Sequence, residues 1–429
     1  MRRSRCPASG TGYHASMKEG LFSQGMLASA TQEALITHPT GQFALLLGCL
    51  SVVFWAQGRP IIGRVFKILP AILFCYFVPT ALTAFRVLPE ESALYRWVKD
   101  FVLPASLILL TISLDVPAIL RLGPRALVVF VAGAVGVVVG GPLSLAIWQH
   151  KLPDDAWKAL TYLAGTWIGG SANGVAVQES YGVASAVISP LIVVDIAVAN
   201  VWMAFLIYLA GRRERVDRWL KADSSMIAVL QHEMQEYQDS VTRPTSTKDL
   251  LFVVTLGFGS AWMCHVAAEW LMTLPAISAM KAYLGSFAWK VILVTTLGVG
   301  LSFTRVRSLE GAGASKMGTV LLYMLVACIG AEASFRRMAD SGWYLAVGAT
   351  WMLIHGVIIF GVGRLVRAPI FFIAVGSQAN IGGAASAPIV ASAFNPVLAS
   401  VGVLLAILGY VLGTYGGIIC VQLCRMISD

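Results

Sequence analysis

Apolar residues are gathered along this chain into long runs, which short polar segments separate. Twelve runs can be marked, and most have about the 20 residues that a helix needs to cross a bilayer. They cover approximately residues 34–57, 65–85, 98–115, 124–148, 157–178, 185–210, 249–271, 285–303, 313–333, 343–365, 369–391 and 397–425. The pattern predicts an all-α polytopic membrane protein with about 12 spans, and a count between about 10 and 13 is compatible with it.

One long polar segment, residues 211–248, separates the first six runs from the last six. Its middle is compatible with an amphipathic helix, but no part of it is apolar enough to cross a membrane. The even division indicates an internal duplication. We therefore expect an N-terminal tail at 1–33, a first transmembrane repeat at 34–210, a linker at 211–248 and a second transmembrane repeat at 249–429.

The composition agrees with a membrane protein. Hydrophobic residues make up 57% of the chain and charged residues 12%, whereas a soluble domain has roughly 25% charged residues. In a soluble protein the net charge of +9 would suggest nucleic acid, but here Lys and Arg lie in short loops, where the positive-inside rule explains them. The partners expected are the lipid bilayer and a small solute, with no nucleic acid, and a homodimer is left open.

The distribution of Lys and Arg also predicts an orientation. If all runs cross and the linker is cytoplasmic, 22 of these residues lie inside and 9 outside, which places both termini in the cytoplasm. Arg59, Arg64 and Lys67 fall on the wrong side in this arrangement. The basic N-terminal segment lacks the apolar core of a secretory signal, so a tail or a misassigned start is favoured over a transit peptide.

Two matched segments interrupt the apolar pattern. Residues 165–180 read GTWIGGSANGVAVQES and residues 375–390 read VGSQANIGGAASAPIV. Each combines an Ala-Asn pair with a Gly-Gly pair, lies in the fifth run of its half, and is followed by a proline, Pro190 or Pro396, before or early in the sixth run. Interrupted segments in corresponding positions of two halves are the best sequence indication of a transporter's binding site.

A physical reason supports a broken helix at each of these segments. Glycines permit unwinding, and a helix that is broken in the membrane exposes N–H groups that attract anions and carbonyls that attract cations. Close packing of small residues would explain one segment, but two matched segments with buried amides favour a site. The residues expected to bind substrate are Gly169, Gly170, Ser171, Asn173, Gln178, Ser377, Gln378, Asn380, Gly382 and Gly383.

One carboxylate, Asp195, lies near the middle of an otherwise apolar run, with Asn200 five residues later. An ionisable group inside a membrane is costly, so Asp195 is predicted to couple transport by binding Na⁺ or a proton, although a structural hydrogen bond is the alternative. Asn200 and Glu179 are the other ion-coupling candidates, and Glu179 is equally compatible with a place at the membrane interface. His355 is a weaker candidate, for which a bond to a carbonyl is favoured over proton relay.

No other cofactor or metal is expected beyond Na⁺ at these residues. The seven cysteines are scattered and form no metal or redox motif. The chain has no nucleophile elbow, zinc-protease motif, phosphate-binding loop or calcium loop, so an enzyme is not expected. Without an ATP site, the energy for transport would come from an ion gradient.

Three segments resemble hallmark sequences of domain-of-unknown-function family 819: GTWIGGSANGVAVQESYGV, VVDIAVANVWMAFLIYLAG and QANIGGAASAPIVASAF. The resemblance covers nearly all of residues 40–425. It implies a bacterial inner membrane, or a plastid membrane if the source is a plant. The family is distantly similar to bile acid:sodium symporters, auxin carriers and cation/proton antiporters.

The wider resemblance implies inverted repeats, two broken helices that cross at mid-membrane, and a core that moves against a panel. It further implies that residues of the two halves meet at the crossing point, namely Asn173, Gln178, Glu179, Asp195, Gln378, Asn380 and the glycines. Inverted repeats would make the broken helices antiparallel, whereas six crossings between them make them parallel. Either one run does not cross, a crossing is missed, or the repeats are not inverted.

The function expected is an ion-coupled secondary transporter of a small organic solute, with an anion favoured and Na⁺ or H⁺ as the coupling ion. It would work by alternating access around the crossed broken helices. The alternatives are a Na⁺/H⁺-type cation antiporter and a channel or membrane receptor.

Overall fold

The computed structural model describes residues 34–60, 62–67, 71–222, 244–278, 285–333, 341–395 and 398–428. The predicted tail at 1–33, Pro396 and most of the predicted linker lie outside these residues. Every regular element in the described part is a helix. Seven of these helices are long and apolar enough to cross a membrane: α2 (Pro39–Gln57), α7 (Pro124–Trp148), α10 (Ser185–Ala210), α13 (Thr247–Met272), α16 (Ala314–Glu332), α18 (Ser341–Leu365) and α21 (Ala399–Ser428).

Shorter helices complete the described part. Four apolar ones of intermediate length are α3 (Ala71–Ala84), α15 (Ser286–Ser302), α19 (Ile370–Ile381) and α20 (Gly383–Phe394), and α8 (Ala156–Gly169) and α9 (Ser171–Ser180) have a similar length. A second set consists of α4 (Ala93–Trp97), the π-helical turn η2 (Val98–Val102) and α5 (Leu103–Thr111), which follow one another without a gap. The remainder are η1 (Ile62–Lys67), α6 (Val116–Arg121), η3 (Gln149–Lys151), α11 (Arg213–Leu220), α14 (Pro275–Ser278) and η4 (Arg305–Glu310).

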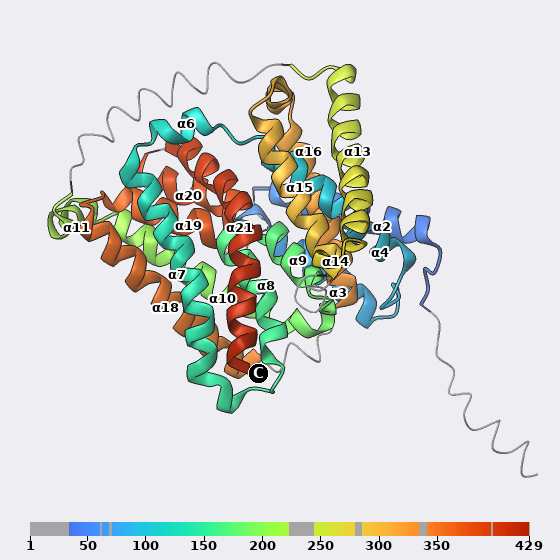
Figure 1. Ribbon diagram of the computed structural model, residues 1–429, viewed down its shortest axis with the longest axis horizontal. Helices are drawn as coiled ribbons and strands as arrows, with labels where there is room; N and C mark the ends of the chain where they lie inside the picture. Colours follow the sequence, from blue (N-terminus) through green and yellow to red (C-terminus); the bar gives the residue numbers. More distant parts are fainter. Residues whose placement is uncertain are drawn as a thin grey trace, which may run out of the picture.

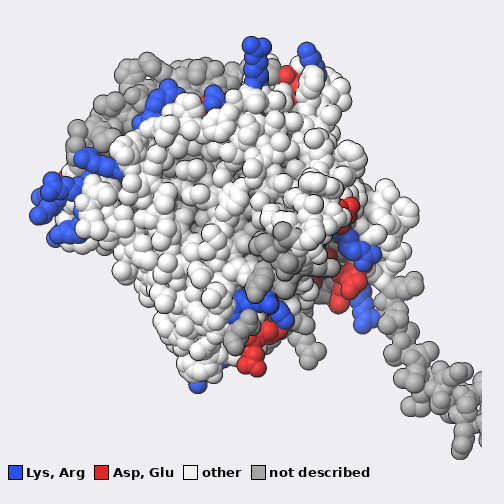
Figure 2. All heavy atoms as spheres, viewed as in Figure 1, with Lys and Arg blue, Asp and Glu red and all other residues white. Residues whose placement is uncertain are grey.

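The outer surface of the bundle is apolar, as a surface in contact with lipid must be. On α7 the exposed side chains recur every three or four residues and form one stripe: Val128, Val131, Val135, Val139, Leu143 and Ile147. Over most of the face drawn in Figure 2 the residues are uncharged, and charged side chains gather along its edges. The protein is therefore a polytopic membrane protein, as the apolar runs predict.

The helices pack into two groups, and each group contains helices from both halves of the chain. The group that we call the panel contains α2, α3, α4–α5, α13, α15 and α16. The group that we call the core contains α7, α8, α9, α10, α18, α19, α20 and α21. In Figure 1 the core lies mainly on the left and the panel on the right.

The two interrupted runs form helical hairpins. Hairpin 1 is α8 and α9, which meet at Gly170, and hairpin 2 is α19 and α20, which meet at Gly382. In each hairpin an aromatic ring near the start of the first arm contacts one at the end of the second. The ring centroids of Trp157 and Tyr181 lie 6.0 Å apart, and those of Phe371 and Phe394 lie 5.4 Å apart.

These contacts correct the prediction that the two runs are broken transmembrane helices. A straight helix from residue 371 to residue 394 would be about 35 Å long, at 1.5 Å per residue, so its two ends could not touch. Each run instead reverses direction, so that its two ends lie on the same side of the helix bundle. The breaks lie at the predicted glycines, but after each break the helix turns back and does not continue in the same direction.

The tips of the two hairpins touch. Gly170 and Gly383 both have positive φ angles, of 77° and 57°, which a residue with a side chain adopts only with strain. A Cβ atom on Gly170 would lie 3.6 Å from the Cα of Gly383, which is an ordinary van der Waals distance and shows that the tips are in contact. The positive φ angles are therefore the reason that both turns use glycine.

The hairpins open toward opposite ends of the molecule. At the open end of hairpin 2, the backbone N–H of Ile370 donates to Asp217 of α11 at 2.7 Å. At the open end of hairpin 1, the guanidinium of Arg425 lies 5.7 Å from the ring centre of Trp157. We call the first end, where α11 lies, the linker end, and the second, where α21 terminates, the far end.

This arrangement conflicts with the prediction that the linker and the C-terminus share one side of the membrane. Helix α21 starts beside hairpin 2 at the linker end and finishes beside hairpin 1 at the far end, where Figure 1 marks the C-terminus. The physical reason is the hairpin, because a run that returns to its own side contributes no crossing.

Candidate functional site

A cavity of about 240 Å³ lies where the two hairpin tips face the panel. The core supplies Thr166, Gly170 and Ser171 from hairpin 1, the middle of α10, and the tip of hairpin 2 with the adjoining turns of both its arms. The panel supplies the end of α2, the start of α3 and Tyr323. The full lining is Gln57, Phe66, Ala71, Ile72, Thr166, Gly170, Ser171, Asp195, Ile196, Ala199, Asn200, Met203, Tyr323, Gln378, Ile381, Gly382, Ala385, Ser386 and Ile389.

Among the described residues that line this cavity, Asp195 is the one with a charged side chain. Its Oδ1 accepts a hydrogen bond of 2.7 Å from Nε1 of Trp167, a side chain that is completely buried in hairpin 1. The structural hydrogen bond expected as the alternative is therefore present, and because the same carboxyl group also lines the cavity, its coupling role stays a prediction. A carboxylate held in this way can bind a cation or take up a proton.

Two helix N-termini also lie at the tips. Helices α9 and α20 start directly after Gly170 and Gly382, and no side chain caps either helix. An uncapped N-terminus presents backbone N–H groups and the positive end of the helix dipole. The cavity therefore combines positive helix ends, which favour an anion, with the acidic side chain of Asp195.

Of the residues predicted to bind substrate, Gly170, Ser171, Gln378 and Gly382 line the cavity, and so does the ion-coupling candidate Asn200. The sequence reasoning missed the hydroxyl groups of Thr166 and Ser386, which lie four residues before Gly170 and after Gly382. The sequence places a hydroxyl side chain one helical turn from each break, and this spacing could have identified both residues.

The two predicted asparagines do not line the cavity. Nδ2 of Asn173 donates to the carbonyl oxygen of Tyr410 in α21 at 2.7 Å. Nδ2 of Asn380 donates to the carbonyl oxygens of Phe130 in α7 at 3.1 Å and of Gly376 at 2.9 Å. These amides fasten the hairpins to the surrounding core helices.

The amide oxygens of the hairpins are buried, and within the described residues they have no hydrogen-bond partner. They are Oδ1 of Asn173, Oε1 of Gln178, Oε1 of Gln378 and Oδ1 of Asn380. In three of these amides the nitrogen donates to a backbone carbonyl, which cannot donate in return, so the orientation of the amide is determined. Neutral oxygens of this kind are suitable ligands for Na⁺.

Ser377 belongs to a buried hydrogen-bonded chain rather than to the cavity lining. Nε1 of Trp202 donates to its Oγ at 2.8 Å, and this oxygen lies 2.8 Å from Nε2 of His355. Nδ1 of His355 lies 2.9 Å from the carbonyl oxygen of Gly133, which can only accept. Nδ1 therefore carries the proton and Nε2 accepts from the serine, which agrees with the favoured bond between His355 and a carbonyl.

Gly169 and Glu179 also lie away from the cavity. Gly169 packs on α21, because a Cβ atom there would collide with the carbonyl oxygen of Gly409. Glu179 pairs with Lys99 at 3.0 Å, near the first turn of α10. Asp195 is ten residues further along α10 than Ser185, or about 15 Å at 1.5 Å per residue, so Glu179 and Asp195 do not converge.

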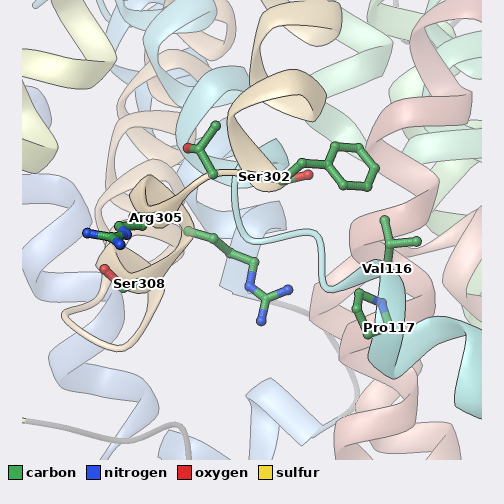
Figure 3. Close-up of a pocket in the computed structure, with 8 residues that line it drawn as sticks. Val116, Pro117, Ser302, Arg305 and Ser308 are labelled. Atoms are coloured by element: carbon green, nitrogen blue, oxygen red, sulfur yellow. The ribbon is translucent and has the colours of Figure 1, made fainter.

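A second hollow lies at the linker end of the panel, between α6 and η4 (Figure 3). Arg305 and Ser308 lie on one side of it, and Val116 and Pro117 on the other. Arg307, which also lines it, forms an ion pair of 3.2 Å with Asp115. No predicted site residue lies here, so the cavity at the hairpin tips is the candidate site.

The chain is 23% identical over 343 residues to uncharacterized membrane protein YjcL of Bacillus subtilis (strain 168), an alignment that covers 77% of this chain and 84% of that protein. The model of a family described as protein of unknown function (DUF819) matches residues 44–427. That match spans both hairpins and the helices that carry them, and it confirms the resemblance to family 819. The chain is a member of the DUF819 family.

Proposed function

We propose that this protein is a secondary transporter that couples the movement of a small anionic organic solute to Na⁺ or H⁺. The observation that carries the proposal is the contact between two hairpin tips from different halves of the chain, beside a cavity that contains Asp195. Uncapped helix ends at a midplane site, next to an ionisable group, are the arrangement that secondary transporters use for an anion and its coupling ion.

The membrane path that fits this proposal has ten crossings. Helices α2, α3, α4–α5, α7 and α10 cross in the first half, and α13, α15, α16, α18 and α21 cross in the second. Because each half then has an odd number of crossings, the second half is inverted relative to the first. The hairpins enter from opposite sides, which removes the conflict between inverted repeats and six intervening crossings.

Alternating access would occur at the interface between the core and the panel. The cavity is lined by both groups, so a shift of the core against the panel would expose the hairpin tips first to one side and then to the other. Each hairpin would carry its tip with it as a rigid unit, since the amides of Asn173 and Asn380 bind it to α21 and α7.

The cavity lining also favours a second candidate function, a cation antiporter. No Lys, Arg or His is among the described residues that line the cavity, whereas Asp195 is. If the helix ends do not hold an anion, the same carboxylate would bind Na⁺ and H⁺ in turn. An exchange of Na⁺ for H⁺ across proteoliposomes, in the absence of any organic solute, would favour this candidate.

The proposal is tested by a melting-temperature screen of the purified full-length protein against small organic anions, in Na⁺ and in K⁺. We expect at least one anion to raise the melting temperature in Na⁺ but not in K⁺, and the same anion to show Na⁺-dependent counterflow in proteoliposomes. Asp195→Asn should abolish both effects. Stabilisation that is independent of the cation, without counterflow, would argue against coupled transport.

A further inference from the structure

A buried group of charged side chains connects the core to the panel at the far end. Nζ of Lys99, in the π-helical turn η2 of the panel, lies 3.0 Å from Oε1 of Glu179 and 2.5 Å from Oε2 of Glu332. It also lies 3.3 Å from Oγ of Ser185. The charged side chains are only 14 to 17% exposed, so water screens their interaction weakly.

The four residues come from both groups of helices. Lys99 and Glu332 belong to the panel, whereas Glu179 ends hairpin 1 and Ser185 begins α10, both in the core. A second bond joins the groups here, because Oγ of Ser185 donates to Oε2 of Glu332 at 2.6 Å. A single lysine thus holds one carboxylate from each side of the interface.

The position of this cluster is opposite to the open side of the cavity. The panel residues that line the cavity include the exposed Gln57 at the end of α2 and Ala71 at the start of α3, which lie toward the linker end. Glu332 ends α16 and Glu179 lies at the end of α9, both toward the far end, and Lys99 lies beside them in the π-helical turn between α4 and α5. The structure therefore has its cavity between core and panel on one side and its ionic contact on the other.

We propose that Lys99, Glu179, Ser185 and Glu332 form a gate that closes the far end, and that access from that end requires Glu179 and Ser185 to leave their panel partners. The proposal rests on alternating access, the function proposed above. The π-helical turn supports it, because such turns occur frequently at functional sites. When Glu179 moves away, Lys99 still pairs with Glu332, so its ammonium group retains a counter-charge.

A native cysteine reports on this gate. Cys328 is completely buried in α16, one helical turn before Glu332 and on the same side of the helix. With every other cysteine replaced by serine, the rate at which a charged maleimide labels Cys328 in the detergent-solubilised full-length protein measures how often the far end opens. This labelling measurement requires neither a substrate nor a known orientation of the protein in a membrane.

We expect Glu179→Gln, which keeps the size of the side chain, to raise the labelling rate at least tenfold. The matched control is Asp100→Asn, which breaks an ion pair of 3.2 Å with Lys290 that lies wholly within the panel. It should leave the rate unchanged. Equal rates for Glu179→Gln and the parent protein would overturn the proposal.

Exchanging the charges of Lys99 and Glu179 distinguishes loss of the gate from a general loss of structure. Lys99→Glu alone should label rapidly, and the double variant Lys99→Glu with Glu179→Lys should label as slowly as the parent, since it again places one lysine against two glutamates. A double variant that labels as fast as the single one would count against the gate. If labelling of Cys328 responds as expected but no solute is transported, the gate is supported and the proposed transport function is refuted. If the protein transports a solute but the labelling rate is unchanged, the transport function is supported and the gate is refuted.

Discussion

Asp195 shows how one side chain combines a structural and a chemical role. Its Oδ1 accepts the hydrogen bond from the buried indole of Trp167, while the carboxyl group lines a cavity whose described lining residues include no basic side chain. Two substitutions separate these roles, because asparagine keeps the acceptor oxygen and loses the charge, whereas alanine loses both.

We therefore expect Asp195→Asn to melt close to the parent temperature and to lose Na⁺-dependent stabilisation. Asp195→Ala should be less stable by about 1–3 kcal/mol, the cost of a buried donor without a partner. Thermal melting in detergent, with and without Na⁺, measures both quantities. If the asparagine variant still responds to Na⁺ as the parent does, Asp195 is not the coupling site.

The helices next to the hairpins are shaped by glycine. On α21, Gly409, Gly413 and Gly417 recur every four residues and lie against hairpin 1. A Cβ atom on Gly413 would lie 2.7 Å from the Cα of Gly169, and one on Gly417 would lie 3.1 Å from the Cα of Gly165. Close packing of small residues thus explains Gly169 and Gly165, whereas Gly170 and Gly383 serve the turn and the tip contact.

This packing predicts that Gly413→Ala destabilises the protein by about 1–3 kcal/mol, since backbone atoms of hairpin 1 would have to move. The control is Gly300→Ala in α15, where the added atom meets nothing within 4 Å. That control should be neutral or slightly stabilising, because alanine favours a helix over glycine by about 0.5–1 kcal/mol. Equal melting temperatures for the two variants would refute the packing argument.

The hairpin tips lead to a different prediction. Gly170→Leu and Gly383→Leu each place a side chain between the tips at a residue with positive φ, so each should abolish Na⁺-dependent stabilisation and solute counterflow. Gly259→Leu in α13, where a Cβ atom meets nothing within 4 Å, should retain both. Normal behaviour of both tip variants would show that the contact between hairpins has no part in function.

At the scale of the whole molecule, the hairpins decide the path of the chain through the membrane. Because neither hairpin crosses, the linker and the C-terminus lie at opposite ends of α21. The count of 22 Lys and Arg against 9 assumed twelve crossings; with the ten crossings proposed above, it becomes 17 on the linker side against 14 on the other. The charge asymmetry that predicted cytoplasmic termini is therefore largely removed.

Single cysteines in a cysteine-free background test this path. Glu214→Cys lies in α11 at the linker end, and Met426→Cys lies near the end of α21, where the native side chain is 75% exposed. A membrane-impermeant maleimide applied to intact cells should label one of the two and not the other, and permeabilised cells should show labelling of both. If neither site is labelled in intact cells and both are labelled after permeabilisation, the path with twelve crossings and a cytoplasmic linker and C-terminus is restored.

The sequence by itself determined the membrane class and the positions of the breaks, because these depend on local properties: the apolar length of a run, and glycine where φ is positive. Four of the ten predicted substrate residues and two of the three ion-coupling residues line the cavity for the same reason, since they lie next to the breaks or in the middle of α10.

Only the tertiary structure decided the rest. A break allows a helix either to continue or to reverse, and the choice depends on contacts such as that between Phe371 and Phe394, which are far apart in the chain. Likewise, the partners of Asn173 and Asn380 are carbonyls of other helices, and Lys99 meets Glu179 and Glu332 only because core and panel pack together. The local sequence around an amide or a charged side chain is the same whether that group lines a cavity, binds a backbone carbonyl or forms an ion pair. Its role therefore depends on which surfaces the fold brings into contact.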